Sequence, residues 1–187
     1  MRYNLFMKLV ILLNLFLLFH DELPAQNAER SIYAEINVPA KLEEVWEAWT
    51  TEEGVKSFFA PACHIVFRVK GPYEMYFNQS AEAGKKGGEG NIILAYETNK
   101  MISFTWNAPP TMPTVRQQLT HVTIRFTEQD DNTIKVTLNH DGWGDGEEWD
   151  KAFNYFDRQW NNVVLPMLKY RFENGSVNWK NPPKIQY

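Results

Sequence analysis

Apolar and polar residues alternate over positions 30–38, and this period of two predicts a half-buried strand that ends at Pro39. The period then lengthens, because the next apolar residues lie three and four positions apart: Leu42, Val45, Trp46 and Trp49. That spacing predicts one face of a helix. The segment 51–59 predicts a second short helix, with Thr50 and Glu53 spaced as a capping box.

Short segments with a period of two fill the middle of the chain. They predict further strands, over 63–69, 73–77, 91–98, 101–106, 117–126 and 133–140. Two segments between them predict loops, the glycine-rich 78–90 and the proline-rich 107–114. Short connections between neighbouring strands are typical of an antiparallel sheet.

A long helix is predicted near the C-terminus, ending at Asn174 and Gly175. Asp145 is expected to cap its first turn with Glu148 as capping-box partner, and Pro166 is expected to kink it. At about 1.5 Å per residue, about 28 residues would span about 42 Å, enough to cross a whole sheet. Its apolar stripe begins with aromatic residues: Trp149, Phe153, Phe156, Trp160, Val163, Val164 and Met167.

This order of elements predicts an α+β fold. We expect a curved antiparallel sheet of about six to seven strands that grips the long C-terminal helix, with two short helices after the first strand. Such a sheet leaves space between itself and the helix, where a ligand could bind.

The first 25 residues differ from the rest of the chain. Two basic residues precede an apolar run from Leu9 to Phe19, and Ala25 offers a small residue before a cleavage point. The run is short for a bilayer span and typical of a signal peptide. We therefore expect residues 1–25 to direct export to the periplasm or the medium, with no stable membrane span after cleavage. The alternative is an uncleaved membrane anchor.

The remaining chain, 26–187, suits a single domain with a core over 31–174 and a short tail over 175–187. The net charge is −4 and no basic run exists, so nucleic acid is not an expected partner. Cys63 is the only cysteine, which excludes an intrachain disulfide. Alternation places Cys63 on an inward face, as a buried and unreactive thiol.

Five stretches carry a resemblance to a known family: "INVPAKLEEVWEAWTTEEGVKSFF", "KGPYEMYF", "GEGNIILAYETNKMISFTW", "HVTIRF" and "VTLNHDGWGDGEEW". Their order and spacing resemble the START-like, helix-grip (SRPBCC) superfamily, and within it the Aha-type domain family, named for activation of the heat-shock protein ninety ATPase. The resemblance implies a cavity between sheet and long helix. Many members bind apolar or aromatic ligands there and a few catalyse reactions on them, whereas most Aha-type members share no catalytic residues. A fold is therefore implied more firmly than a function.

The segment "HDGWGDGEEW", positions 140–149, gathers four acidic residues beside one histidine. Local roles explain most of the acids, since Asp145 and Glu148 would cap the helix and Glu147 would favour its positive dipole end. We therefore expect no metal ion, no cofactor and no catalytic residue here. Two interpretations of His140 stay open: a buried histidine bonded to a backbone carbonyl, or a polar group at the cavity mouth that orients a ligand or acts as a base.

Aromatic residues on inward faces are the main positive signal for a function, because such residues line most ligand pockets. With residues at the expected mouth they form the candidate ligand-binding set: Phe58, Phe59, Phe67, Tyr73, Met75, Phe77, Tyr96, Phe104, Trp106, His140, Trp143, Phe153, Phe156 and Trp160. We expect the partner to be a hydrophobic or aromatic small molecule, bound without catalysis. Two alternatives stay open: a co-chaperone or protein-interaction module of the Aha type, which the export signal disfavours, and a cyclase- or hydrolase-like enzyme with His140 as acid or base.

Overall fold

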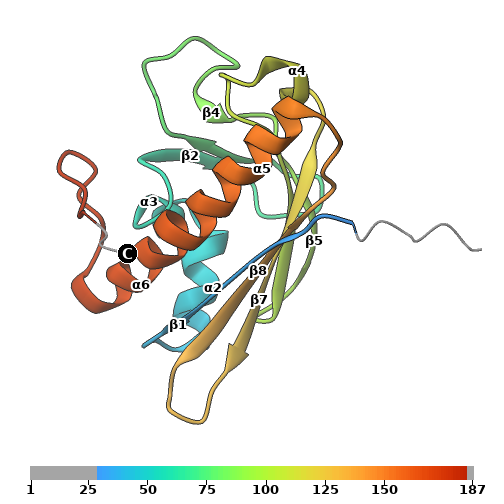
Figure 1. Cartoon of the computed structure of the whole chain (residues 1–187). Helices are drawn as coiled ribbons and strands as arrows, with labels where there is room; N and C mark the ends of the chain where they lie inside the picture. Colours follow the sequence, from blue (N-terminus) through green and yellow to red (C-terminus); the bar gives the residue numbers. More distant parts are fainter. Residues whose placement is uncertain (1–28, 185–187) are drawn as a thin grey trace, which may run out of the picture.

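The computed structural model describes residues 29–184, so the predicted signal peptide lies outside the described residues. Figure 1 shows a long helix lying across a twisted sheet, with shorter helices and further strands beside it. The arrangement is α+β, and the long C-terminal helix and the two short helices after the first strand are confirmed.

Within the described residues, the strands form two antiparallel sheets. The larger sheet contains, in spatial order, β1 (Ile32–Val38), β8 (Ile134–Asp141), β7 (Thr120–Glu128), β6 (Met101–Trp106) and β5 (Ile93–Glu97). The smaller sheet contains β2 (Ala62–Ile65), β3 (Tyr73–Tyr76) and β4 (Gly87–Gly88). The structure therefore differs in one respect from the single sheet of six to seven strands that the alternation predicts.

The division between the sheets has its origin in segment 66–72, of which alternation predicts residues 66–69 as the second half of a strand. The backbone of this segment forms tight turns. The N–H of Arg68 donates to the carbonyl of Val66 (2.8 Å), and the N–H of Gly71 donates to the carbonyl of Arg68 (2.7 Å). The strand β2 consequently ends at Ile65. The two sheets stay joined, because the N–H of Ile93 donates to the carbonyl of Gly71 (3.0 Å).

The helices after β1 are α2 (Leu42–Thr50) and α3 (Glu52–Lys56). The predicted capping box at Thr50 and Glu53 is wrong by one residue. Thr51 caps α3 instead, with its Oγ1 accepting from the N–H of Gly54 at 3.0 Å. Thr50 still belongs to α2, where its hydroxyl donates to the carbonyl of Trp46 at 2.8 Å. The cap moves because α2 continues one residue further than its apolar stripe.

The long helix begins differently from the prediction. Gly146, with φ of 110°, precedes its first residue and no side chain caps it, so the expected cap at Asp145 is wrong. Glu148 is not a capping-box partner either. Its carboxylate accepts a hydrogen bond from the backbone N–H of Val115 at 3.0 Å. That bond ties the helix start to a short helix in the proline-rich loop. The bounds are α4 (Pro113–Arg116), α5 (Glu147–Gln159), η1 (Trp160–Val164) and α6 (Leu165–Asn174).

The middle of the long helix is one π-helical turn, η1. The N–H of Leu165 donates to the carbonyl of Trp160, five residues earlier. Pro166 follows directly; it has no N–H and its ring crowds the carbonyl four residues before it. The wider turn accommodates that proline. A kink was expected at Pro166, and the helix shows a π-helical turn directly before it instead. Pairs of residues that line one helix face therefore change spacing at η1.

The core lies between the larger sheet, the long helix and α2. Alternate side chains of the central strands point into it and are buried: Val122, Ile124 and Phe126 from β7, and Val136, Leu138 and His140 from β8. Tyr73 of β3 joins this core and donates its hydroxyl to the carbonyl of Trp49 at 2.8 Å. Over residues 29–184, no helix has both the length and the apolar character that crossing a membrane requires.

Candidate ligand-binding pocket

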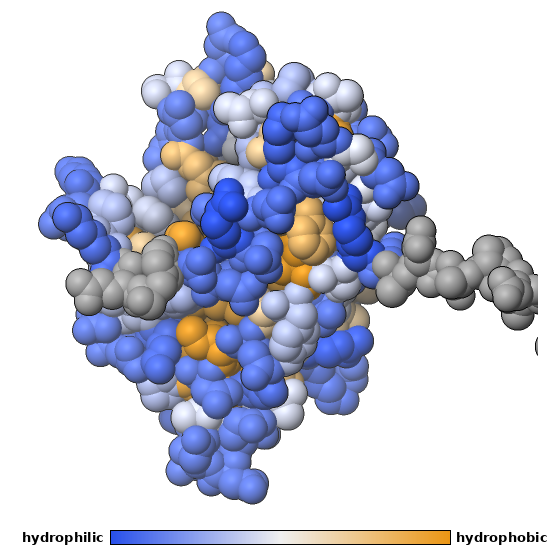
Figure 2. Space-filling model, viewed as in Figure 1, coloured by the Kyte–Doolittle hydropathy of each residue, from blue (hydrophilic) through white to orange (hydrophobic). Residues whose placement is uncertain are grey.

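A pocket of about 250 Å³ lies along the long helix, between η1, the end of α3 and the segment that follows α6. Figure 2 shows apolar residues flanking the polar outer face of this helix. Aromatic and aliphatic side chains dominate the lining: Phe58, Phe59, Phe77, Trp106, Tyr155, Phe156, Gln159, Trp160, Val163, Val164, Met167 and Trp179. Gln159 is the one amide among them, and no charged side chain is present. The pocket is therefore suited to an apolar molecule.

Phe59 is the centre of the aromatic wall. Its ring stacks on Trp106 of β6, with centroids 5.6 Å apart and planes inclined by 20°. The rings of Trp160 and Phe77 lie 5.7 Å and 6.1 Å from it. These offset and tilted pairs are the favourable geometries for aromatic rings. Phe59 is only 4% exposed, so it forms part of the wall rather than of the mouth.

The long helix contributes the facing wall. Phe156 and Gln159 come from α5, Trp160, Val163 and Val164 from η1, and Met167 from α6. The π turn thus lies directly at the pocket. Two successive valines of this turn, Val163 and Val164, belong to the lining.

The segment after the long helix closes one side of the pocket. Trp179 lines the pocket, and its indole N–H donates to the carbonyl of Lys56 at 2.6 Å. The backbone N–H of Val177 donates to the carbonyl of Ser57 at 2.8 Å. Arg171 adds a bond from its Nε to the Ser57 hydroxyl at 3.2 Å. The segment 175–180 is thus fastened to the end of α3.

Six residues of the predicted set line this pocket: Phe58, Phe59, Phe77, Trp106, Phe156 and Trp160. That they contact a ligand stays a prediction. Six lining residues lie outside that set: Tyr155, Gln159, Val163, Val164, Met167 and Trp179, of which Val163, Val164 and Met167 belong to the predicted apolar stripe of the long helix. Gln159 lies three residues after Phe156, but a polar residue gives no signal in a hydrophobic pattern. Trp179 follows the helix, where no periodic pattern marks it, although a tryptophan two residues after Val177 is an apolar signal.

Three other predicted residues belong to the packed core. Tyr73, Met75 and Phe104 are fully buried, and the rings of Tyr73 and Phe104 are 4.5 Å apart. None of them lines the pocket. Their inward orientation is as predicted, but they lie deeper in the core than the pocket.

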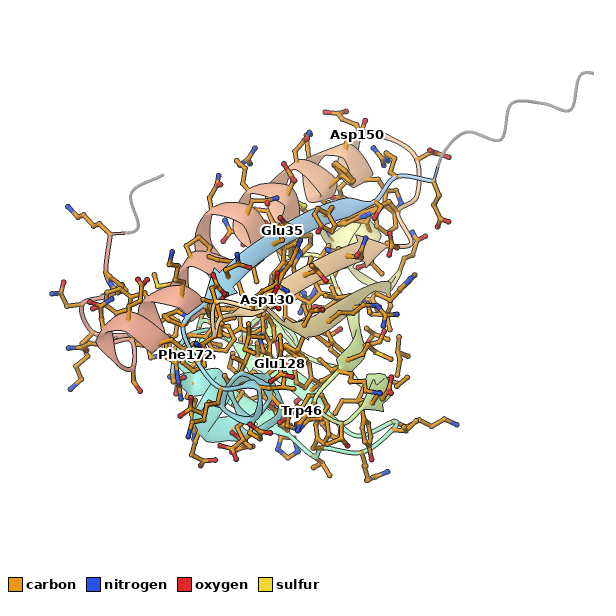
Figure 3. All side chains as sticks on the ribbon, turned by 90° about the horizontal axis from the view of Figure 1, so that it is seen from below. Glu35, Trp46, Glu128, Asp130, Asp150 and Phe172 are labelled. Carbon is orange, nitrogen blue, oxygen red and sulfur yellow. The ribbon has the colours of Figure 1, made fainter. Side chains whose placement is uncertain are left out.

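Phe67 and Tyr96 form a separate group. Phe67 lies in the turn segment after β2, and its ring packs 4.7 Å from Tyr96 and 5.5 Å from Trp46 of α2. Tyr96 is 41% exposed. The expectation that Phe67 faces the cavity on a strand is wrong, because the strand ends before it. Figure 3 shows Trp46 on α2, far from the beginning of the long helix at Asp150.

Trp143 and Phe153 lie near that beginning of the long helix. Their rings are 5.2 Å apart, and the guanidinium of Arg30 lies 5.2 Å from the Phe153 ring while also pairing with Asp150. The Trp143 indole donates to the carbonyl of His140 at 2.7 Å. Neither aromatic residue lines the pocket. Both instead secure the glycine-rich connection between β8 and α5.

His140 is fully buried and both of its ring nitrogens are bonded. The indole N–H of Trp160 donates to Nδ1 at 2.9 Å, so Nδ1 carries no proton. Nε2 therefore carries the proton and donates to the hydroxyl of Thr120 at 2.7 Å. That hydroxyl donates in turn to the carbonyl of Trp106 at 2.8 Å. The chain of bonds fixes one neutral tautomer behind the pocket wall.

Burial lowers the pKa of His140 well below its usual value, and the nearby His121 lowers it further. Protonation would also require Nδ1 to give up its bond from Trp160. A base needs a lone pair that faces the substrate. The lone pair of Nδ1 faces Trp160 instead, and His140 does not line the pocket. Of the two interpretations, the structure favours the buried histidine, with a hydroxyl in place of the expected backbone carbonyl.

The acidic segment 140–149 forms no coordination centre. Within residues 29–184, no three His, Cys, Asp or Glu side chains come together as a metal ion would require. The exposed His121 lies 3.9 Å from Asp141, as a pair on the sheet surface. Cys63 is half-buried, and burial raises the pKa of its thiol to about 11, which disfavours a reactive thiolate.

A family model described as "Activator of Hsp90 ATPase homolog 1-like protein", AHSA1, matches residues 39–173. The chain belongs to the AHSA1 family. The match covers α2 through nearly all of α6, and so includes every strand except β1. No protein of curated function matches the chain in sequence.

Solved structures share this AHSA1 fold at low sequence identity. The Aha1 dimer from Colwellia psychrerythraea is 20% identical, with a TM-score of 0.60, and the match covers 78% of this chain and 98% of that one. Protein MLL2253 from Mesorhizobium loti is 18% identical, with a TM-score of 0.62 and coverages of 79% and 100%. DynU16, a putative protein in the dynemicin biosynthetic locus, is 17% identical, with a TM-score of 0.58 and coverages of 78% and 48%. At these identities the likeness concerns the fold.

The AHSA1 match also separates the pocket into two parts. Most of its lining lies within residues 39–173, whereas Trp179 lies after the matched range. The pocket of this AHSA1 member thus combines a wall built from the family fold with a wall supplied by the segment that follows it.

Proposed function

We propose that this protein is an exported binding domain that holds a small hydrophobic or aromatic molecule in the pocket beside η1, without catalysing a reaction on it. The observation that carries the proposal is the pocket itself: about 250 Å³ of space bounded by aromatic rings and aliphatic side chains. An apolar cavity of about 150 Å³ is enough to bind benzene. A pocket of this size therefore suits a body of about two fused rings.

The surroundings of His140 support binding over acid–base catalysis. The only buried histidine among the described residues has both nitrogens occupied by Trp160 and Thr120. Tyr155 is the one residue with a titratable side chain among those that line the pocket. Burial raises the pKa of its phenol, which is therefore neutral at physiological pH. The pocket offers apolar contact and few groups to move a proton.

Isothermal titration with 2-naphthalenemethanol, an uncharged two-ring probe, tests the proposal. Burial of about 200 Å² of apolar surface at about 25 cal/mol per Å² is worth about 5 kcal/mol, which corresponds to a Kd of about 0.2 mM. Val163→Phe should fill the pocket and weaken binding at least about tenfold. Val66→Phe, the same substitution at a 39% exposed position outside the pocket, should leave the Kd unchanged.

Absence of saturable binding to the wild-type protein would overturn the proposal, as would equal binding by both variants. Thermal melting of each variant checks that Val163→Phe is folded. Export is tested separately: mass spectrometry of the protein recovered outside the cytoplasm should give a chain that begins near Gln26 rather than at Met1.

A further inference from the structure

A second hollow, of about 200 Å³, adjoins the pocket. Phe77, Trp106, Tyr155 and Phe156 line both spaces, so the two are separated by no more than these side chains. The remaining wall of the second hollow comes from the loop around β4 and from the loop after β6. Four of its residues there have polar or cationic side chains, Asn78, Lys85, Lys86 and Asn107, and the others are Gly87, Gly88, Pro109 and Pro110.

Lys86 brings a positive charge to this second hollow without a matching carboxylate. Within the described residues it forms no salt bridge, and its Nζ lies 5.7 Å from the ring of Tyr76. Lys85 pairs with Glu82 at 2.9 Å, but both side chains are well exposed, so solvent screens that pair. The charge of Arg116 is paired, because its guanidinium lies 4.0 Å from the carboxylate of Glu89 while also donating to three backbone carbonyls.

The carboxylates of Glu89 and Glu74 accept hydrogen bonds from other groups. Glu89 accepts from the backbone N–H groups of Gly84 (2.7 Å) and Lys86 (2.6 Å), and Glu74 accepts from the N–H of Gly90 (2.6 Å) and from the hydroxyl of Tyr76. No acidic side chain in the described part of the chain lines either space. The two adjoining spaces therefore differ in their lining, because two lysines are added to apolar surface at the β4 loop.

We infer that the ligand is an amphipathic anion: an aromatic or alkyl body that occupies the apolar pocket and a carboxylate that lies beside Lys86 and Lys85. This inference rests on the proposed function, because it specifies the chemistry of the molecule that the pocket holds. An ammonium group at the same end would meet two like charges and no acidic side chain, so cationic amphiphiles are disfavoured.

A matched pair of probes tests the inference: 2-naphthoate and 2-naphthalenemethanol, which share the ring system and differ in charge. An ion pair at a partly exposed site should make the carboxylate bind about two- to fivefold more tightly at low ionic strength. Addition of about 0.5 M salt should remove most of that advantage, because screening shortens the range of the attraction.

Lys86→Gln should bring the ratio of the two Kd values close to one. Lys100→Gln is the matched control, since Lys100 is an exposed lysine on the turn between β5 and β6, paired with Glu97. It should leave the ratio unchanged. If the alcohol binds and the carboxylate binds no better, or if Lys86→Gln keeps the advantage, the inference is overturned while the pocket proposal stands. If neither probe binds saturably, both are overturned.

Discussion

The bonds around His140 lead to a quantitative prediction about Thr120→Val. Valine has nearly the shape of threonine, so the change removes a hydroxyl and little else. In the folded protein the indole N–H of Trp160 donates to Nδ1 of His140, so Nδ1 is unprotonated and the proton is on Nε2. Without the Thr120 hydroxyl this N–H has no acceptor, and the imidazole cannot change tautomer without losing the bond from Trp160. No arrangement of protons satisfies the ring in this variant.

The magnitude follows from the burial of these groups. His140 is fully buried and Thr120 is 4% exposed, so water does not replace the lost partner. An orphaned buried donor costs about 1–3 kcal/mol. The carbonyl of Trp106 also loses the Thr120 donor, which places the expected loss in the upper part of that range. In a domain of this size, each kcal/mol lowers the Tm by about 2–4 °C.

Urea unfolding followed by tryptophan fluorescence measures the effect. Thr120→Val should lower the free energy of unfolding by about 2–3 kcal/mol with an unchanged slope against urea. The control is Thr123→Val on the same strand, where the hydroxyl makes one part-buried bond of 3.2 Å to Ser103. It should cost less than about 1 kcal/mol. Equal losses in the two variants would refute the idea that the His140 bonds stabilise this end of the core.

Two further predictions concern titratable groups. The free energy of unfolding should fall as the pH decreases below about 6.5, by up to about 1.4 kcal/mol per pH unit, because burial lowers the His140 pKa and the unfolded chain binds the proton first. Above about pH 6.5, His140 no longer makes the free energy of unfolding depend on pH. Urea titrations of His140→Gln should show no such pH dependence, whereas those of His121→Gln should keep it. Alkylation of Cys63 by iodoacetamide at about pH 8 should be about 100-fold slower in the folded protein than in urea, because burial raises the thiol pKa to about 11; equal rates would contradict this.

The strands of the larger sheet could be predicted because one face of each is buried. Along β7 and β8, alternation correctly assigned Val122, Ile124, Leu138 and His140 to the inside. The same rule failed at Phe67. A period of two shows which face a residue would occupy in a strand, but it does not show where turns such as those of segment 66–72 end the strand.

The pocket was less predictable than the core for a physical reason. An inward position on a strand or helix can meet either packed side chains or open space, and the difference depends on how far apart the elements lie. Phe104 and Trp106 are two residues apart on β6 and both point inward, yet only Trp106 reaches the pocket. The place of Trp179 in the pocket could not be predicted for another reason. Trp179 belongs to no periodic element, and one hydrogen bond from its indole to the carbonyl of Lys56 holds it there.

The attachment of residues 175–180 to α3 has a consequence for how the shape of the pocket can be altered. Trp179 contributes to the pocket but lies after the region that the family model matches, residues 39–173. Substitutions in this segment can alter the shape of the pocket without disturbing the sheet or the long helix, whose packing constrains most other lining positions. The shape of the pocket can therefore be changed through one short segment while the sheet and the long helix stay as they are.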